Sequence, residues 1–305
     1  MSSRGPWDRE GRRSSLGSFT LVEMILAIGI LSILVIMLAS MLGALTSAWQ
    51  DGEAHNERRM VAQAALDKIS RELSIAAFPV QRTTNGLQMI INPPTVSSTY
   101  EYPHATFWQA PLATDGGTNG NLAVVGYFIQ WTNMTPCLSR VLINPSSSDY
   151  AVYTSPNQWI SDTLIQAHAS LNNYAGLMAE NVIGIWFQAL DPNGNPIQQT
   201  LPNGAPETFD SRYPYAYTNH FLAGWNWETN TTFSAPASIQ VAVAVMDSRT
   251  AKQLTAIPTS YRSTYPPTAG SLWSDIQYFY TGLPKVIQKG TEIQMTTVNL
   301  ADAPH

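Results

Sequence analysis

The residue with the clearest chemical purpose in this 305-residue chain is Glu23, a carboxylate at the start of an apolar run. It belongs to the segment Ser18-Phe19-Thr20-Leu21-Val22-Glu23-Met24, and the 22 residues from Met24 to Leu45 carry no charge. An unpaired carboxylate among apolar groups is strongly unfavourable, so a cation is expected to meet it there. Glu23 therefore predicts charge pairing rather than catalysis. The alternative is that Glu23 simply lies among lipid headgroups.

The remaining chain offers few groups arranged for chemistry. Asp191, Asn193 and Asn195 have the spacing of oxygen ligands in a calcium loop, but Pro202 stands where a bidentate Glu is needed. A β-turn over residues 191–195 is the preferred interpretation. The five histidines lack the spacing of zinc ligands, and neither a nucleophile elbow nor a phosphate loop is present. We expect no catalytic residue, cofactor or metal, and a protein that is not an enzyme.

An aromatic tract later in the chain has two interpretations. The tract has asparagines interleaved between its aromatic residues. It would suit a sugar- or protein-binding surface, since Tyr and Trp are enriched in both kinds of contact. An ordered loop that covers a sheet edge is the other interpretation, and the preferred one. The tract consists of Tyr213, Tyr215, Tyr217, Phe221, Trp225 and Trp227.

Composition restricts the class of protein. The chain is 44% hydrophobic and only 12% charged, about half the usual charged share of a globular domain, and its net charge is −5. A polar but uncharged surface is typical of extracytoplasmic β-rich proteins. The acidic balance argues against nucleic acid as a partner, because that would require a basic face. The single cysteine, Cys137, cannot form an intramolecular disulfide and is expected to be a buried thiol.

The uncharged run predicts a membrane span. As a helix it rises roughly 33 Å, which is enough for a bilayer core. Four arginines precede it between residues 4 and 13, and Asp51 and Glu53 follow it, so the N-terminus is expected in the cytoplasm. Ala39 and Gly43 place small residues on one face, where another helix can approach closely.

A secretory signal peptide is the competing interpretation of the same run. It would be cleaved near Thr46-Ser47-Ala48, a weak match to the small residues that such a site needs. The run is longer than a typical signal core, and Glu23 would lie inside its start. Both points favour a retained anchor.

The helical pattern continues beyond the membrane run. Residues 54–77 contain neither Pro nor Gly, and Pro79 ends the pattern, which predicts a helix from Thr20 to about Phe78 with a possible bend at Gly52. Apolar residues recur there at three- and four-residue spacing: Ala62, Ala65, Leu66, Ile69, Leu73 and Ala76. On the side expected to face water are two i,i+4 charge pairs, Asp67–Arg71 and Lys68–Glu72.

Strands and turns dominate the chain after Pro79. Runs rich in β-branched and aromatic residues predict strands at 87–91, 122–131, 138–143, 182–190, 238–246 and 292–299. Short helices are expected at 163–171 and 271–280. The predicted fold is α+β, with one long N-terminal helix packed on an antiparallel β-sheet head.

The segment around Glu23 resembles the cleavage and assembly signal of type IV pilins and of the pseudopilins of type II secretion. The resemblance implies cleavage by a prepilin peptidase between Ser18 and Phe19, which makes Glu23 the fifth mature residue, and N-methylation of Phe19. Ser18 stands where the family most often has Gly. A cut between Gly17 and Ser18 stays open, and it would make Glu23 the sixth residue.

Cleavage would supply the cation that Glu23 needs. The exposed α-amine has an unperturbed pKa of about 7.7–8.0 and is largely protonated at neutral pH. When apolar helices pack into a filament, the Phe19 amine of one subunit, brought level with Glu23 of its neighbour, offsets the burial of the carboxylate. A register error leaves both charges unmatched, so the pair would also align the subunits.

The head carries a more diffuse resemblance. The order of strands at 124–129 (VVGYFI), 138–141 (LSRV), 181–187 (NVIGIWF) and 235–241 (APASIQV) resembles the pseudopilin J family of type II secretion. It is also similar to the Verru_Chthon cassette protein C family. The resemblance implies a pilin-like head that works as a minor pseudopilin.

Together these features divide the chain into a prepilin leader (1–18), a transmembrane assembly helix (19–50), its amphipathic continuation (51–78) and a periplasmic β-rich head (79–305). The resemblance implies a single-pass inner-membrane protein that is a structural, tip-proximal subunit of a type II secretion-like or type IV pilus-like filament. It implies other pseudopilins or pilins, the prepilin peptidase and an inner-membrane assembly platform as partners. The alternative is a membrane-anchored extracytoplasmic adhesion or carbohydrate-binding protein that uses the tract 213–227.

Overall fold

The computed structural model of the chain describes residues 20–78, 88–93, 105–114, 120–132, 135–152, 175–197, 199, 209–220, 227–233, 235–253 and 271–300. The chain forms two compact units, Met1–Gly52 and Glu53–His305. The first unit is helical over its described residues. The second contains the continuation of the same helix together with the β-sheets.

The longest element is α1 (Leu21–Leu73), which runs without interruption through Gly52. It is long and apolar enough to cross a membrane, with a mean hydropathy of 2.8 in its most apolar stretch. The helix ends five residues before the predicted Phe78. The reason is tertiary: the backbone N–H of Ala77 donates to the carbonyl oxygen of Gln109 at 2.8 Å, which commits the chain to the neighbouring sheet.

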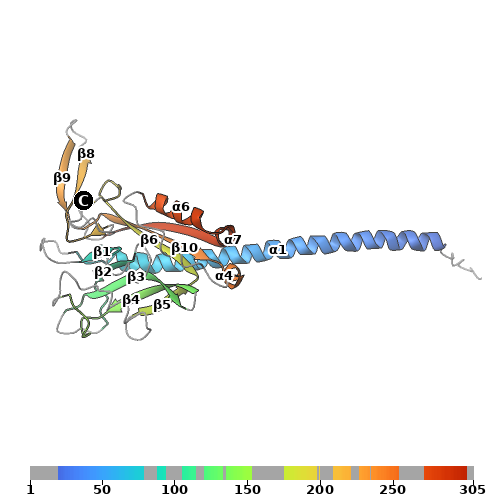
Figure 1. Ribbon diagram of the computed structural model, residues 1–305, viewed down its shortest axis with the longest axis horizontal. Helices are drawn as coiled ribbons and strands as arrows, with labels where there is room; N and C mark the ends of the chain where they lie inside the picture. The colour runs from blue at the N-terminus through green and yellow to red at the C-terminus, as the bar shows by residue number, and fades with distance from the viewer. Residues whose placement is uncertain are drawn as a thin grey trace, which may run out of the picture. The chain divides into compact units, whose positions relative to one another are not determined.

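The described strands of the second unit form antiparallel sheets (Figure 1). A six-stranded sheet has the order β5-β4-β3-β2-β1-β7, and a three-stranded sheet has the order β11-β10-β6. The strands of the first are β1 (Met89–Ile91), β2 (Thr106–Ala110), β3 (Ala123–Thr132), β4 (Thr135–Ile143), β5 (Ala175–Glu180) and β7 (Phe209–Asp210). Those of the second are β6 (Val182–Leu190), β10 (Ser238–Met246) and β11 (Thr291–Asn299).

Smaller elements complete the described part of this unit. A two-stranded hairpin pairs β8 (Tyr215–His220) with β9 (Trp227–Phe233). Three helices follow β10 in the chain: α4 (Ser248–Gln253), α6 (Leu272–Gly282) and α7 (Lys285–Gly290). The side chain of Ser271 caps α6 by accepting a hydrogen bond from the backbone N–H of Ser274.

The second half of α1 lies between the two larger sheets, and this arrangement makes the core (Figure 1). Ala62, Ile69 and Leu73 of the helix are fully buried. They belong to one cluster with Trp108 and other residues of the six-stranded sheet and with Val241 and other residues of the three-stranded sheet. A second cluster buries Trp186, whose ring packs edge-on against Phe279 of α6 at 5.0 Å.

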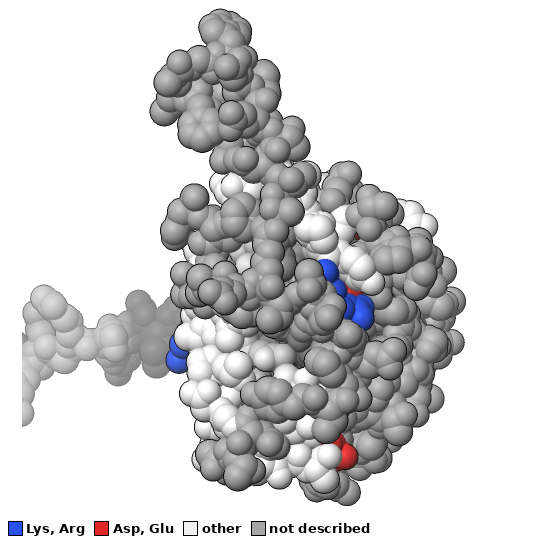
Figure 2. Space-filling view, turned by 90° about the vertical axis from the view of Figure 1, so that its left-hand side faces the viewer, with Lys and Arg blue, Asp and Glu red and all other residues white. Residues whose placement is uncertain are grey.

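The end of the head near β1, β8 and β9 is mostly uncharged over its described surface (Figure 2). This agrees with the low charged share of the composition.

The predicted α+β class and the burial of the six apolar positions are confirmed; five of these positions lie on α1, and Ala76 follows its end. The strands predicted at 182–190 and 238–246 match β6 and β10 to the residue, and the helix predicted at 271–280 is α6. The sequence patterns missed β2, β5, β7, β8, β9, α4 and α7. The helix predicted at 163–171 lies outside the described residues.

Candidate functional site

The first half of α1 has no apolar partner within the described chain. Its large apolar side chains are between 51% exposed at Leu34 and 76% exposed at Leu21. Glu23 is the only charged residue between Thr20 and Gln50. An apolar surface of this extent marks contact with lipid or with other helices.

Thr20 and Glu23 form a capping box at the start of α1. Oε2 of Glu23 accepts hydrogen bonds from the Thr20 backbone N–H at 3.0 Å and from the Thr20 hydroxyl at 3.1 Å. In return, the Glu23 backbone N–H donates to Oγ1 of Thr20 at 3.3 Å. Each side chain thus satisfies a backbone N–H that the first turn of a helix leaves without a partner.

The capping box gives Glu23 a local role that the sequence interpretation missed. The Thr-x-x-Glu spacing before an apolar run is its signature and could have revealed it. Both hydrogen bonds reach Oε2, and no described residue donates to Oε1. One oxygen therefore holds the helix terminus, and the other is open to a group from outside the chain.

The other residues predicted for assembly can be placed only in part. Gly17, Ser18 and Phe19 lie outside the described residues, so the cleavage site and the amine remain predictions. Ala39 and Gly43 lie on exposed helix, and a Cβ added at Gly43 would meet no described atom within 4 Å. This part of α1 leaves room for a close helix–helix approach.

In the second unit, Glu72 anchors α1 to the six-stranded sheet. Although it was predicted to face water, it is only 2% exposed. Its Oε2 accepts hydrogen bonds from the Tyr127 hydroxyl at 2.7 Å and from Nε of Arg140 at 2.9 Å. Its Oε1 forms ion pairs with Nζ of Lys68 at 2.8 Å and Nη2 of Arg140 at 2.9 Å, without the angles of hydrogen bonds. The Trp108 indole donates to its backbone carbonyl at 3.2 Å.

These contacts fix the protonation states of the cluster. Burial alone would raise the pKa of Glu72, but the hydrogen bonds from Arg140 and Tyr127 and the ion pair with Lys68 outweigh it and lower that pKa below its ordinary value. Burial, followed by the hydrogen bond to Glu72, raises the pKa of Tyr127, so its hydroxyl remains a donor. At neutral pH the cluster is a carboxylate held by a guanidinium, an ammonium and a phenol.

A second ionic cluster holds α1 where this helix enters the second unit, near residues 55–58. Nη1 of Arg58 donates to Oδ2 of Asp247 at 2.8 Å, and His55 Nδ1 lies 3.0 Å from Oε2 of Glu292. Asp247 also accepts hydrogen bonds from the backbone N–H and the hydroxyl of Thr250 at the start of α4. The helix is thus tied to one sheet near residue 58 and to the other near residue 72.

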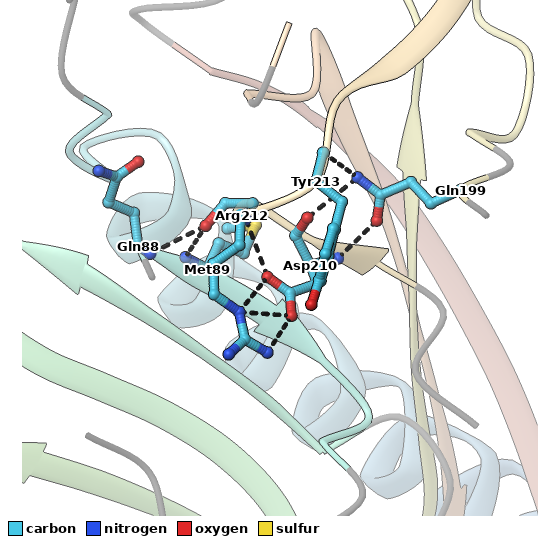
Figure 3. A network of polar contacts seen from close by, with 7 residues as sticks. Gln88, Met89, Gln199, Asp210, Arg212 and Tyr213 are labelled. Atoms are coloured by element: carbon cyan, nitrogen blue, oxygen red, sulfur yellow. Dashed lines mark hydrogen bonds and ion pairs between the residues drawn. The ribbon is translucent and has the colours of Figure 1, made fainter. Parts of the chain in front are cut away.

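A third polar network closes one edge of the six-stranded sheet (Figure 3). The side-chain amide of Gln199 accepts from the Asp210 backbone N–H at 2.8 Å and donates to the Asp210 carbonyl at 3.0 Å. It therefore occupies the position of a neighbouring strand. The fully buried Asp210 carboxylate pairs with Arg212, and the hydroxyl of Ser211 accepts from the backbone N–H groups of Gln88 and Met89. Such a cap prevents the edge strand from pairing with another chain.

The turn at Asp191 has the geometry of a β-turn, as predicted. The Gly194 backbone N–H donates to the Asp191 carbonyl at 2.9 Å, and Gly194 has a φ of 80°. Oδ1 of Asp191 accepts from the backbone N–H groups of Asn193 and Asn195 at 2.9 and 2.8 Å. The carboxylate therefore organises its own turn. No cluster of three His, Cys, Asp or Glu residues suited to a metal occurs among the described residues.

Part of the aromatic tract is buried in the protein core. Tyr215 and Tyr217 are 3% and 6% exposed and belong to the main core, and the Tyr215 hydroxyl donates to the Ala235 carbonyl at 2.9 Å. These two rings are unavailable for stacking on a sugar. Phe221 and Trp225 lie outside the described residues, and only the backbone of Trp227, in β9, is described.

Cys137 is a buried thiol, as predicted, and it is 5% exposed. Burial, with a smaller contribution from the charge of Glu180, raises the pKa of the thiol. The thiol therefore stays protonated and unreactive at neutral pH.

No protein-family model matches this chain, and no curated protein matches it.

Proposed function

We propose that this protein is a prepilin-like minor pseudopilin, a structural rather than catalytic subunit of a type II secretion-like or type IV pilus-like filament. Prepilin peptidase removes residues 1–18, and the apolar half of α1 first anchors the protein in the inner membrane and then packs in the filament. The Phe19 amine of one subunit pairs with Glu23 of the next. Other pseudopilins and an inner-membrane assembly platform are its partners.

The observation that carries the proposal is the first half of α1. It combines a membrane-length apolar surface without a partner in the described chain with a single carboxylate that keeps one oxygen open. A lipid anchor alone explains the apolar surface. The capping box needs only a hydrogen-bond acceptor at this position, so a lipid anchor leaves the negative charge of Glu23 without a partner, whereas a filament supplies one.

The second unit supports a structural role. Its described polar clusters hold α1 against two sheets or close a sheet edge, and each polar group in them has a packing or capping purpose. The orientation follows from the arginine-rich leader, which places the N-terminus in the cytoplasm and the head in the periplasm. Placement near the filament tip rests on analogy with pseudopilins that carry large heads.

The N-terminus of the mature protein tests the proposal. We expect intact-mass and N-terminal analysis of protein purified from membranes to find Phe19, with or without a methyl group, as the first residue. Cleavage by signal peptidase would instead produce a start near Trp49. That result, or a mature protein that begins at Met1, would rule out the proposed function.

A further inference from the structure

Among the described strands, β11 leaves one edge of the three-stranded sheet without a partner. It is the last strand of this sheet, and its nine residues pair with β10 without a shift in register. No described strand pairs with its other side. The segment from Ile293 to Asn299 contains neither a charged residue nor a proline, so β11 is a long, regular and uncharged edge strand.

The other three outer strands of the two larger sheets each carry a feature that discourages the addition of a strand. β7 has only two residues and is capped by Gln199. β5 carries the charge of Glu180 and pairs with β4 through a bulge. β6 pairs with β10 through a bulge, and Pro196 and Ile197 cover its last residues. β11 has none of these features, and an edge of this kind is a ready template for another strand.

The backbone of β11 presents hydrogen-bonding groups at this edge in a regular spacing. At the two ends of the β10–β11 ladder, the N–H of Leu300 donates to the carbonyl of Ala237 and the N–H of Asp247 donates to the carbonyl of Gly290. Bonded and non-bonded pairs alternate in an antiparallel ladder, so the even-numbered residues of β11 point their N–H and C=O groups at β10. The groups that point away belong to odd-numbered residues: Ile293, Met295 and Thr297. Another β-strand supplies donors and acceptors at this spacing.

The side chains beside the edge determine which kind of strand fits. Met295 is 46% exposed and pairs with Ala242, on the face that packs against α6. Gln294 and Thr296 lie on the opposite face, toward α1, and are partly buried. An added strand would set an apolar side chain beside Met295 and uncharged polar side chains beside Gln294 and Thr296. A charge at these positions would lose hydration without an opposite charge nearby on β11 to offset the loss.

We infer that β11 pairs with a β-strand from a different protein, an uncharged extended segment that adds a fourth strand to the three-stranded sheet. The outward backbone groups of the odd-numbered residues hold this segment, and Met295 favours an apolar residue in it. That the donor is a different protein rests on the proposed function, because a minor subunit near the tip has other subunits as neighbours. The pairing itself rests on the edge strand alone.

Hydrogen exchange at single-residue resolution tests the pairing. The tagged full-length protein is purified in mild detergent, once from cells that produce the whole assembly and once from cells that produce this chain alone. We expect the backbone amides of Ile293, Met295 and Thr297 to exchange at least about tenfold more slowly in the first preparation. The amides of Gln294 and Thr296, which already bond to β10, should change less than about twofold. Contact through side chains alone would not produce this alternation.

Substitution and cross-linking identify the donor of the strand. Thr297→Pro removes an outward N–H and leaves the bonds to β10 in place, so recovery of the donor with the tagged protein should fall at least about fivefold. Thr297→Ala keeps that N–H, and recovery should stay within about twofold of wild type. A photoreactive amino acid at Met295 should cross-link to an uncharged segment of a different protein. The same group at Leu177, 61% exposed on β5, should not reach that segment.

Fast exchange at the three outward amides in the assembly, or cross-links from Met295 to a second copy of this chain only, would overturn the inference. If Thr297→Pro unfolds at a lower temperature than Thr297→Ala, the exchange measurement on the wild-type protein still decides. Failure of this inference differs from failure of the proposed function. A protein that begins at Phe19 and assembles while these amides exchange fast keeps the proposed function without this contact, whereas a start near Trp49 with protected amides would mean the opposite.

Discussion

Replacing Glu72 with alanine is expected to lower the free energy of unfolding of the head by about 3 kcal/mol, roughly a hundredfold in the unfolding equilibrium. The loss arises because Arg140, only 22% exposed, would keep its charge without a partner, and Tyr127 would lose its acceptor. Loss of a buried ion-pair partner usually costs 3–5 kcal/mol, and the partial exposure of Arg140 argues for the lower end. Urea unfolding of the full-length protein in detergent, followed by near-ultraviolet circular dichroism, measures the change.

The matched control is Asp67→Ala, one turn earlier on the same helix and exposed. It should change the free energy of unfolding by less than about 0.5 kcal/mol.

The pH dependence of stability is a second readout. The pKa of Glu72 is lower in the folded than in the unfolded state, so the contribution of Glu72 to stability is present above about pH 4.5 and is lost as the pH falls further. The advantage of wild type over Glu72→Gln should shrink in that range. Equal stabilities of Glu72→Ala and Asp67→Ala would contradict the assigned role.

Replacing Glu23 with glutamine is expected to reduce incorporation into filaments at least tenfold, while processing and the amount of protein in the membrane stay at wild-type levels. Glutamine keeps the acceptor that the capping box needs but removes the charge that the neighbouring amine requires. Tenfold corresponds to about 1.4 kcal/mol, a modest share of the energy lost when a charge is buried without its partner. The measurement is the fraction of protein recovered in sheared, sedimented filaments.

Two further variants distinguish charge pairing from helix capping as the role of Glu23. Glu23→Ala removes both the cap and the charge, and Glu53→Ala removes an exposed carboxylate of the same helix beyond the apolar run. We expect Glu23→Ala to fail as Glu23→Gln does, and Glu53→Ala to assemble normally. If Glu23→Gln assembles as well as wild type while Glu23→Ala fails, Glu23 acts only as a helix cap, and the charge-pairing argument is wrong.

The spacing of apolar residues was sufficient to predict those helices and strands whose hydrophobic pattern is strong. The apolar spacing from Ala62 to Leu73 predicted the buried face of α1, and uninterrupted β-branched and aromatic runs predicted β6 and β10. These strands lie in the interior of the fold, where burial on both faces imposes a continuous apolar pattern. The strands β5 and β7 were missed because β7 has only two residues and β5, with the sequence AGLMAE, contains no β-branched or aromatic residue.

The charged residues show where local reasoning fails. Glu72 and Lys68 do form the predicted i,i+4 pair, but Arg140 and Tyr127 from two strands bury it, and nothing within one helix turn predicts that. At Glu23, by contrast, local sequence is enough: the four residues Thr-x-x-Glu predict the capping box. The carboxylate of Glu23 was predicted to pair with a group outside the chain, and in the structure it also accepts hydrogen bonds from Thr20 of the same helix turn.

The central claim is that a liberated amino terminus neutralises the carboxylate of an adjacent subunit, and a zero-length carbodiimide cross-link tests it most directly. Assembled filaments that contain isotopically light and heavy copies would be treated, digested and analysed by mass spectrometry. We predict an amide between the Phe19 amine and the side chain of Glu23, including species that join a light to a heavy copy. Recovery of amino termini that still carry residues 1–18, or of Phe19 amines linked only to other carboxylates, would contradict it.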